Sequence, residues 1–172
     1  MSDVAGALGK AGLRVARFDF PYMRAGRKAP DKAPVLCQTW LDVIAELKPR
    51  AIGGKSMGGR IASMVADEAG VEALVCLGYP FHPPGKPENL RTAHLAELRT
   101  PGLIIQGRRD PFGTEEDVTG YQLSSALRVV WLNGDHSLEP RKAEGVSWPE
   151  NRRLLVEEIQ RFVSPPGPAR KG

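Results

Sequence analysis

The sequence predicts an α/β fold, a three-layer α/β/α sandwich in which helices cover both faces of a mostly parallel sheet. Helical and strand-like hydrophobic patterns alternate along the whole chain, which is typical of such folds. The 172 residues are 41% hydrophobic and 26% charged, as in an ordinary globular protein with one core. We therefore expect one domain over residues 1–163 and a disordered basic tail over 164–172, which is rich in Pro and Gly.

Short apolar runs bounded by Gly or Pro are interpreted as strands. The first run places Val15, Phe18 and Phe20 in a pattern that suits a buried strand, and a proline ends it. The second run is very short and leads directly into Ser56. The predicted strands cover residues 13–20, 51–54, 73–77, 103–106 and 127–132.

Helices are predicted where apolar residues recur every three or four positions. Leu36, Trp40, Ile44 and Leu47 form one such stripe, so this helix should pack on the sheet. The predicted helices are residues 3–10, 36–47 and 89–98, a helix between Ser56 and Gly70, and helices that begin near Thr114 and Ser147. The basic segment 22–34 is predicted to be an exposed loop.

The composition argues against several functions. No apolar run approaches the roughly 18 residues of a membrane span, and the first residues lack the pattern of a signal peptide. The net charge is only +4, and the basic cluster at 24–32 has no aromatic platform or docking helix beside it. Cys37 and Cys76 fit neither a zinc spacing nor a disulfide framework. We expect a cytoplasmic protein that binds neither nucleic acid nor membrane, and its oligomeric state is left open.

The motif that carries chemistry is Gly54-Lys55-Ser56-Met57-Gly58, a Gly-x-Ser-x-Gly pattern between a predicted strand and a predicted helix. In this context Ser56 is at the apex of a sharp turn, and Gly54 and Gly58 omit Cβ atoms that would collide. The helix N-terminus directs the Met57 N–H at negative charge forming beside the serine. One alternative is a turn that only connects two elements. Another is a phosphate-binding loop, which requires a glycine where Pro49 stands.

A serine hydroxyl needs a histidine to take its proton, and the histidine needs a carboxylate to fix its tautomer. The chain has three histidines, and only His136 follows the last predicted strand, where the base is expected. The alternative for His136 is a loop histidine with a purely geometric role. His82 and His94 are interpreted as structural, with His82 in a loop near the rim of the site.

The candidate acid is Asp110, which follows the strand 103–106 across a short turn at the same edge of the sheet. Asp135 is adjacent to His136, so its side chain should point elsewhere. Asp117 falls at the start of a helix. Both are weaker candidates.

Several stretches of the chain carry a resemblance to a known group. They are RFDFPY at 17–22, GGKSMGGR at 53–60, CLGYPFHPPGKP at 76–87, QGRRDPFG at 106–113 and GDH at 134–136. Together they resemble small bacterial α/β-hydrolases related to dienelactone hydrolases and to the testis-expressed and NSL-complex α/β-hydrolase-like proteins of animals. The resemblance implies an α/β-hydrolase fold without a lid domain, with nucleophile, acid and base at Ser56, Asp110 and His136.

Relatives of this kind begin with strands before the first helix, and a loop after one of them supplies a second oxyanion donor. This chain starts inside that helix, so the resemblance implies an N-terminally truncated fold. The missing strand would lie between the strand 13–20 and the strand entering Ser56. Loss of the second donor alone would cost about a hundred- to a thousand-fold in rate.

The function predicted from the sequence is that of a serine hydrolase. It would cleave a small-molecule ester or thioester by acyl transfer to water, using Ser56, His136 and Asp110 without a cofactor or metal. The alternative is a catalytically silent α/β-hydrolase-like interaction domain that binds a partner, through a surface such as the basic loop at 24–32.

Overall fold

The computed structural model describes residues 2–164, and in this part of the chain four strands form one sheet. The strands are β1 (Ala51–Lys55), β2 (Ala73–Leu77), β3 (Gly102–Gly107) and β4 (Leu127–Leu132). Their order in the sheet is their order in the sequence, and each neighbouring pair is parallel. The carboxyl ends of all four strands therefore meet at one edge, where the loops after them lie close together.

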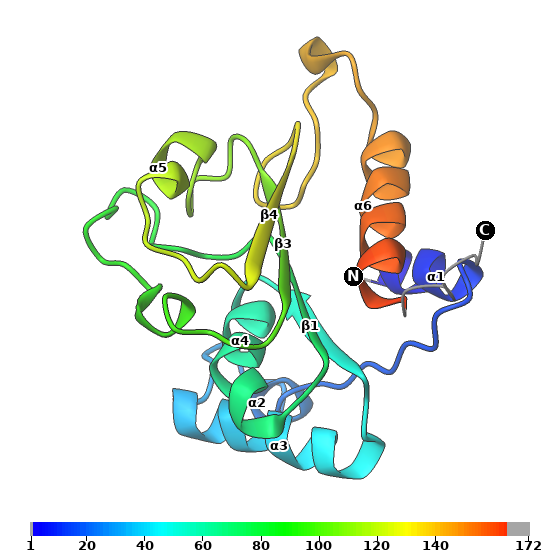
Figure 1. The fold of residues 1–172 in the computed structure, drawn as a ribbon, viewed down its shortest axis with the longest axis vertical. Coiled ribbons are helices and arrows are strands. Elements are labelled where there is room, and N and C mark those ends of the chain that lie inside the picture. The colour runs from blue at the N-terminus through cyan, green and yellow to red at the C-terminus, as the bar shows by residue number, and fades with distance from the viewer. Residues whose placement is uncertain (1, 165–172) are drawn as a thin grey trace, which may run out of the picture.

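Helices cover both faces of the sheet, as Figure 1 shows. α3 (Ala33–Leu47) and α4 (Met57–Ala69) lie on one face, and α1 (Ser2–Lys10) and α6 (Trp148–Val163) lie on the other. The shorter elements are α2 (Pro21–Arg24), α5 (Glu115–Thr119) and the 3-10 turns η1 (Ala93–Leu95) and η2 (Lys142–Glu144). The predicted three-layer α/β/α arrangement is confirmed.

The alternation of side chains along the central strands divides the core into two layers. Leu74 and Cys76 of β2 pack with α3 and α4, whereas Val75 and Leu77 pack with α1 and α6. Every residue of β2 and β3 is buried, as expected for parallel strands covered on both faces. These two strands fix the position of the loops that follow them.

The predicted strand at 13–20 was wrong. The sheet ends at β1, and no strand of the described residues lies beside this segment, which therefore has no ladder of hydrogen bonds to join. Its aromatic residues pack on α3 instead, where the ring of Phe18 meets the ring of Trp40 edge-on with centroids 4.7 Å apart. An apolar extended pattern indicates a strand only if a partner strand is present.

Two further segments differ from their predictions. The helix predicted at 89–98 was wrong, and only the turn η1 forms there. The segment before η1 is tied to the preceding loop, since the Arg91 N–H donates to the Phe81 carbonyl. The loop predicted at 22–34 contains most of the single-turn helix α2. The predicted tail at 164–172 lies outside the described residues apart from Ser164, which caps α6.

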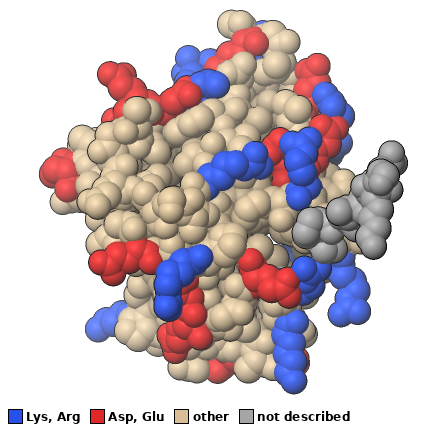
Figure 2. All heavy atoms as spheres, viewed as in Figure 1, with Lys and Arg blue, Asp and Glu red and all other residues tan. Residues whose placement is uncertain are grey.

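The surface carries both signs of charge. On the face shown in Figure 2, Lys and Arg side chains are interspersed with Asp and Glu side chains. Ion pairs at the surface include Arg50 with Glu72 and Arg153 with Glu157. Across residues 2–164, none of the helices has the length and apolar character that a membrane crossing needs.

Candidate active site

Ser56 occupies a strained turn between β1 and α4. Its backbone has φ 51° and ψ −123°, a conformation that L-residues other than glycine rarely adopt. Two hydrogen bonds hold it there: the Ser56 N–H donates to the Leu77 carbonyl at 2.9 Å, and the Arg60 N–H donates to the Ser56 carbonyl at 3.0 Å. Strain that neighbours enforce in this way is typical of functional sites, where it directs a side chain outward.

The close approach at this turn involves Gly54 and Gly59. A Cβ atom on Gly54 would lie 2.8 Å from the Gly59 nitrogen, and one on Gly59 would lie 2.6 Å from the Gly54 carbonyl oxygen. A Cβ atom on Gly58 would meet no described atom within 4 Å. The predicted close approach of Gly54 and Gly58 is confirmed, since a Cβ atom on Gly54 would also lie 2.8 Å from the Gly58 carbonyl carbon. The predicted collision of a Gly58 Cβ atom was wrong, because the side-chain position that points at β1 is that of Gly59.

His136 lies in the loop after β4, and hydrogen bonds fix the shape of this loop. The Asp135 carboxylate accepts the Ser137 N–H at 2.7 Å and the Glu139 N–H at 3.2 Å. The side chain of Asn151, from α6, donates to the carbonyls of Asn133 and Leu138 at 2.6 and 2.9 Å. Asp135 thus serves the loop, as the sequence suggested, and does not contact the imidazole.

Two glycines at the ends of central strands let this loop lie against the sheet. A Cβ atom on Gly78, just after β2, would be 2.6 Å from the His136 carbonyl oxygen. A Cβ atom on Gly107, at the end of β3, would be 2.2 Å from the Asp135 carbonyl oxygen. Any larger residue at either position would push the imidazole away from the strand ends.

Asp110 follows β3 and is completely buried. Its Oδ1 accepts the Phe112 N–H at 2.9 Å, and its Oδ2 accepts an amide N–H of Gln106 at 2.8 Å. The same Oδ2 lies 2.8 Å from Nδ1 of His136. A buried carboxylate with hydrogen bonds on both oxygens has a fixed orientation, and here that orientation faces the imidazole.

The three side chains singled out by the sequence come together in one hydrogen-bonded chain. Nε2 of His136 lies 2.9 Å from Oγ of Ser56. Because the Asp110 carboxylate accepts the Nδ1–H, Nε2 is left to accept the hydroxyl proton of Ser56. Phe112 packs its ring against the imidazole with centroids 4.3 Å apart. This arrangement can draw the proton from Ser56 as its oxygen attacks an electrophile.

The residues on either side of Ser56 in the sequence offer two further groups. Met57 is the first residue of α4, and the backbone N–H groups of a first helical turn have no acceptor within their own helix. The Lys55 ammonium donates to Oγ of Ser137 at 2.9 Å, which links the residue before Ser56 to the residue after His136.

Asp117, His82 and His94 each make contacts away from the chain of Ser56, His136 and Asp110. Asp117 accepts the N–H and the hydroxyl of Thr114 and so caps α5. His82 is buried, with Nδ1 2.8 Å from the Pro83 carbonyl oxygen, so it does not line an open rim. Nε2 of His94 lies 2.8 Å from Oγ of Ser63, and burial, aided by nearby Arg60, lowers the pKa of His94.

Cys76 is the thiol nearest the turn, and it is not suited to nucleophilic chemistry. It is buried in β2, its Sγ contacts the Gly59 carbonyl at 3.4 Å, and burial raises its pKa to about 12. The thiol therefore stays protonated at neutral pH, and the thiolate is the reactive form of cysteine. Both cysteines are free.

Sequence reasoning missed two residues that support the site, Gln106 and Asn151. Both side chains are polar and buried. Gln106 follows the apolar run of β3, whereas Asn151 has charged neighbours in the sequence and shares only the buried stripe of α6 with Leu155 and Ile159. A lone polar residue in an apolar run is a usable signal, because a buried amide must find hydrogen-bond partners. The signal indicates a polar contact, but it does not reveal which loop provides the partner.

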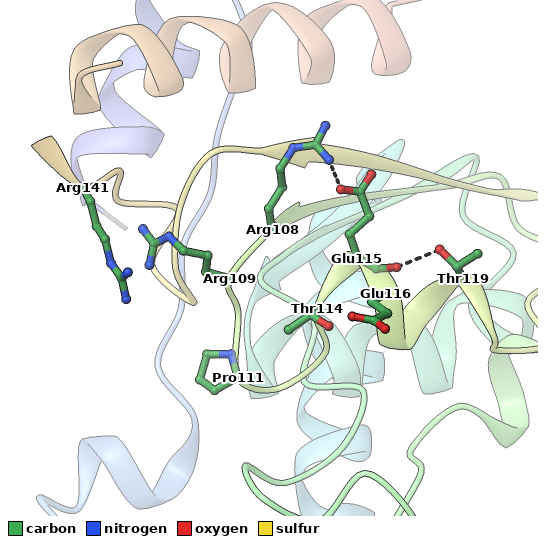
Figure 3. A pocket seen from close by; sticks show the side chains of 8 residues that line it. All are labelled: Arg108, Arg109, Pro111, Thr114, Glu115, Glu116, Thr119 and Arg141. Atoms are coloured by element: carbon green, nitrogen blue, oxygen red, sulfur yellow. Dashed lines mark hydrogen bonds and ion pairs between the residues drawn. The ribbon is translucent and has the colours of Figure 1, made fainter. Parts of the chain in front are cut away.

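A hollow of about 790 Å³ lies on the outer side of the Asp110 loop (Figure 3). Its lining is Arg108, Arg109, Pro111, Thr114, Glu115, Glu116, Thr119 and Arg141. Arg108 pairs with Glu115 and Arg109 pairs with Glu144, so much of the charge is satisfied locally. Neither Ser56 nor His136 lines this hollow, and it is separate from the hydrogen-bonded chain.

Across residues 2–164, no group of three or more His, Cys, Asp or Glu side chains is arranged to hold a metal ion.

The parallel sheet, the strained serine turn and the order of Ser56, Asp110 and His136 define the class as that of the α/β-hydrolase fold. A family model described as an alpha/beta hydrolase domain matches residues 1–164. The chain belongs to this family.

Solved structures with the same fold come from several organisms. An α/β serine hydrolase homologue from Coxiella burnetii has a TM-score of 0.69 and 23% identity, over 92% of this chain and 74% of that one. A monoacylglycerol lipase from Paleococcus ferrophilus has a TM-score of 0.71 and 14% identity, over 93% of this chain and 88% of that one. A lidless α/β serine hydrolase from Xanthomonas campestris has a TM-score of 0.63 and 17% identity, over 97% of this chain and 74% of that one. At these identities the likeness concerns the fold.

Proposed function

We propose that this protein is a serine hydrolase that cleaves a small ester or thioester by transfer of the acyl group to water. The observation that carries the proposal is the continuous contact from Ser56 Oγ to His136 Nε2, at 2.9 Å, and from His136 Nδ1 to Asp110 Oδ2, at 2.8 Å. A general base within hydrogen-bond distance of a serine hydroxyl is the geometric requirement for nucleophilic attack.

In the first half of the reaction, Ser56 Oγ attacks the carbonyl carbon and passes its proton to Nε2 of His136. The Asp110 side chain accepts the Nδ1–H of the imidazolium and stabilises its charge. The Met57 N–H donates to the negatively charged oxygen of the tetrahedral intermediate. When the intermediate collapses, His136 returns the proton to the departing alkoxide or thiolate, and an acyl-enzyme remains on Ser56.

In the second half, water replaces the leaving group. His136 takes a proton from the water molecule as its oxygen attacks the acyl-enzyme, and then gives that proton to Ser56 Oγ as the acid departs. The balance is one ester or thioester and one water consumed for one acid and one alcohol or thiol. No cofactor or metal takes part in these steps.

The environment of the imidazole supports a small substrate that arrives from solution. The His136 side chain is 23% exposed, so the hydrogen-bonded chain reaches the surface. The connection from β2 to β3 contains the short turn η1 and no longer helix, and Tyr79, Phe81 and His82 are buried in it. A connection of this kind does not form a lid, in agreement with the lidless fold of the Xanthomonas campestris structure.

The family relation, the cellular location and the kind of partner are also proposals. We infer a relation to dienelactone hydrolases from the sequence stretches that suggested it, and a cytoplasmic location from the two free thiols. A small molecule is the proposed partner, rather than nucleic acid or a membrane. Opposite charges are mixed on the face in Figure 2, which favours this choice for that face.

The test is covalent labelling of the full chain with a fluorophosphonate probe, together with hydrolysis of p-nitrophenyl acetate. We expect the probe to label Ser56 alone. Ser56→Ala should abolish labelling and lower kcat by at least about a thousand-fold, whereas Ser125→Ala, at an exposed serine before β4, should change neither. A properly folded wild type that neither hydrolyses the ester nor is labelled at Ser56 would contradict the proposal and leave the interaction domain as the alternative.

A further inference from the structure

Gln106 is a buried amide at a position where the fold would otherwise place an apolar side chain. It lies on β3, two residues after Ile104, and its side chain has no exposed surface. Because side chains alternate along a strand, Gln106 and Ile104 share the face that packs against α3 and α4. A polar group in such a place is costly unless its hydrogen bonds are satisfied.

The amide of Gln106 satisfies its bonds with loop backbones. Its Oε1 accepts the Tyr79 N–H at 2.7 Å, and its Nε2 donates to the Tyr79 carbonyl at 3.1 Å. The last backbone bond between β2 and β3 runs from the Gly78 N–H to the Ile105 carbonyl. The side chain of Gln106 therefore takes the place of the next peptide group and extends the ladder beyond the end of the strand.

The same Nε2 reaches the loop after β3. It donates to Oδ2 of Asp110 at 2.8 Å and lies 3.2 Å from the Gly113 carbonyl oxygen. One amide thus links the segment after β2 with the loop that contains Asp110. The segment after β2 also contains Gly78, which contacts the His136 backbone.

The contact with Asp110 bears on the imidazole directly. Oδ2 is the oxygen shared by Gln106 Nε2 and His136 Nδ1, and Oδ1 is occupied by the Phe112 N–H. Rotation of the carboxylate about its Cβ–Cγ bond would break the contacts with Gln106 and Phe112 together. The two neutral donors therefore hold one carboxylate orientation, in which Oδ2 faces Nδ1.

We propose that Gln106 is a positioning residue, which acts through Asp110 to fix the orientation and tautomer of His136. The catalytic consequence rests on the proposed function, but the orientation of the imidazole does not require turnover. The amide holds Oδ2 at the Nδ1–H before any substrate is present. Nε2 is thereby kept free of its proton and directed at Ser56.

The first experiment uses wild-type protein and proton NMR. A histidine Nδ1–H bonded to a buried carboxylate gives a strongly deshielded proton, and the chain has only three histidines to assign. We expect this proton for His136, with a nuclear Overhauser contact to a Gln106 amide proton that exchanges slowly with solvent. A Gln106 amide that exchanges freely or shows no such contact would overturn the proposal.

The second experiment compares Gln106→Met with Gln38→Met. Gln38 also donates from Nε2 to an aspartate four residues later, Asp42, at 2.8 Å, but both lie exposed on α3. In Gln106→Met the deshielded His136 proton should be lost or move strongly upfield. The kcat for p-nitrophenyl acetate should fall by about a hundred-fold with little change in KM, as expected for misplacement of a catalytic group. Gln38→Met should behave as wild type.

A purely structural role for Gln106 predicts a different outcome. Gln106→Met would then melt at a lower temperature yet retain the deshielded proton and kcat once folded, and this result would overturn the proposal. If Gln106→Met does not fold, the wild-type measurement decides by itself. A folded wild type with neither esterase activity nor labelling of Ser56 would contradict the proposed function, while the His136 signal would still test the position of the imidazole.

Discussion

Two aspartates at opposite ends of the sheet accept hydrogen bonds from different kinds of partner. Asp110, at the carboxyl ends of the strands, is fully buried, and its Oδ2 faces an imidazole. Asp67, near the end of α4, accepts the N–H and the hydroxyl of Thr100 and the N–H of Arg99, just before β3. In open α/β sheets, ligands bind at the carboxyl ends of strands. The comparison thus separates a carboxylate that faces an imidazole, for which we propose a chemical role, from one that only joins α4 to the segment before β3.

The largest expected effect is that of Asp110→Asn. The amide that replaces the carboxylate can present its own N–H to Nδ1 of His136, which would place the imidazole proton on Nε2, facing Ser56. The base would then have the wrong tautomer, and kcat for p-nitrophenyl acetate should fall by about ten-thousand-fold. The matched variant Asp42→Asn, at the exposed partner of Gln38, should retain full activity. An Asp110→Asn protein within ten-fold of wild type, as a rough limit, would contradict the assigned role.

The next effect tests the strained turn through a pair of adjacent glycines. Gly59→Ala brings a Cβ atom to 2.6 Å from the Gly54 carbonyl oxygen, so it should lower the free energy of unfolding by about 1–3 kcal/mol. Gly58→Ala meets open space and should raise it by up to about 1 kcal/mol through helix propensity. Urea denaturation measures both. Equal effects of the two variants would show that the close approach at Gly59 is relieved by backbone movement.

A third prediction concerns Asp67. Burial raises the pKa of its carboxyl, but the hydrogen bonds from Thr100 and Arg99 outweigh burial and lower it to about 2. Since the pKa is lower in the folded state, the stabilisation is fully present above the ordinary pKa of about 4 and is lost as the pH falls toward 2. At pH 7, Asp67→Asn should cost about 2 kcal/mol and leave kcat unchanged.

The measurement for Asp67 is thermal melting of wild type and Asp67→Asn from pH 7 to pH 3. The difference in Tm should narrow below about pH 4, where the wild-type carboxylate begins to lose its advantage over the unfolded chain. Asp42→Asn again serves as the exposed control. A difference that stays constant with pH would show that ionisation of Asp67 does not contribute to stability.

The sequence predicted the sheet from the alternation of apolar runs, and it predicted Ser56, Asp110 and His136 from their order relative to the strands. Because parallel strands end at one edge, residues just after three different strands must lie near one another. The strand at 13–20 failed because pairing depends on a neighbouring strand, and its predicted burial holds only in part, since Val15 is exposed. The structure buries Phe20 against Leu36 and Trp40 instead.

Details that depend on the exact direction of a side chain could not be predicted. Gly58 and Gly59 are the same residue type at adjacent positions. Only the helix geometry shows that the side-chain position of Gly59, and not that of Gly58, points at Gly54. The Gln106 amide could have met any loop at the carboxyl edge, and its contacts with Tyr79 and Asp110 follow from the paths of two loops. Such paths are set by tertiary packing rather than by local pattern.

The smallest expected effect is that of Lys55→Met, which removes a second hydrogen bond between the segments that contain Ser56 and His136. The bond from Lys55 Nζ to Ser137 Oγ runs beside the bond between Ser56 and His136 and joins the same two segments. Both partners are only partly buried, so loss of the bond should cost about 1 kcal/mol or less. Asp110 and the Asn151 contacts already hold the His136 loop, and kcat should therefore fall by only a few-fold. Ser137→Ala should match Lys55→Met in kcat, and the double variant should be no worse than either, because both remove the same bond.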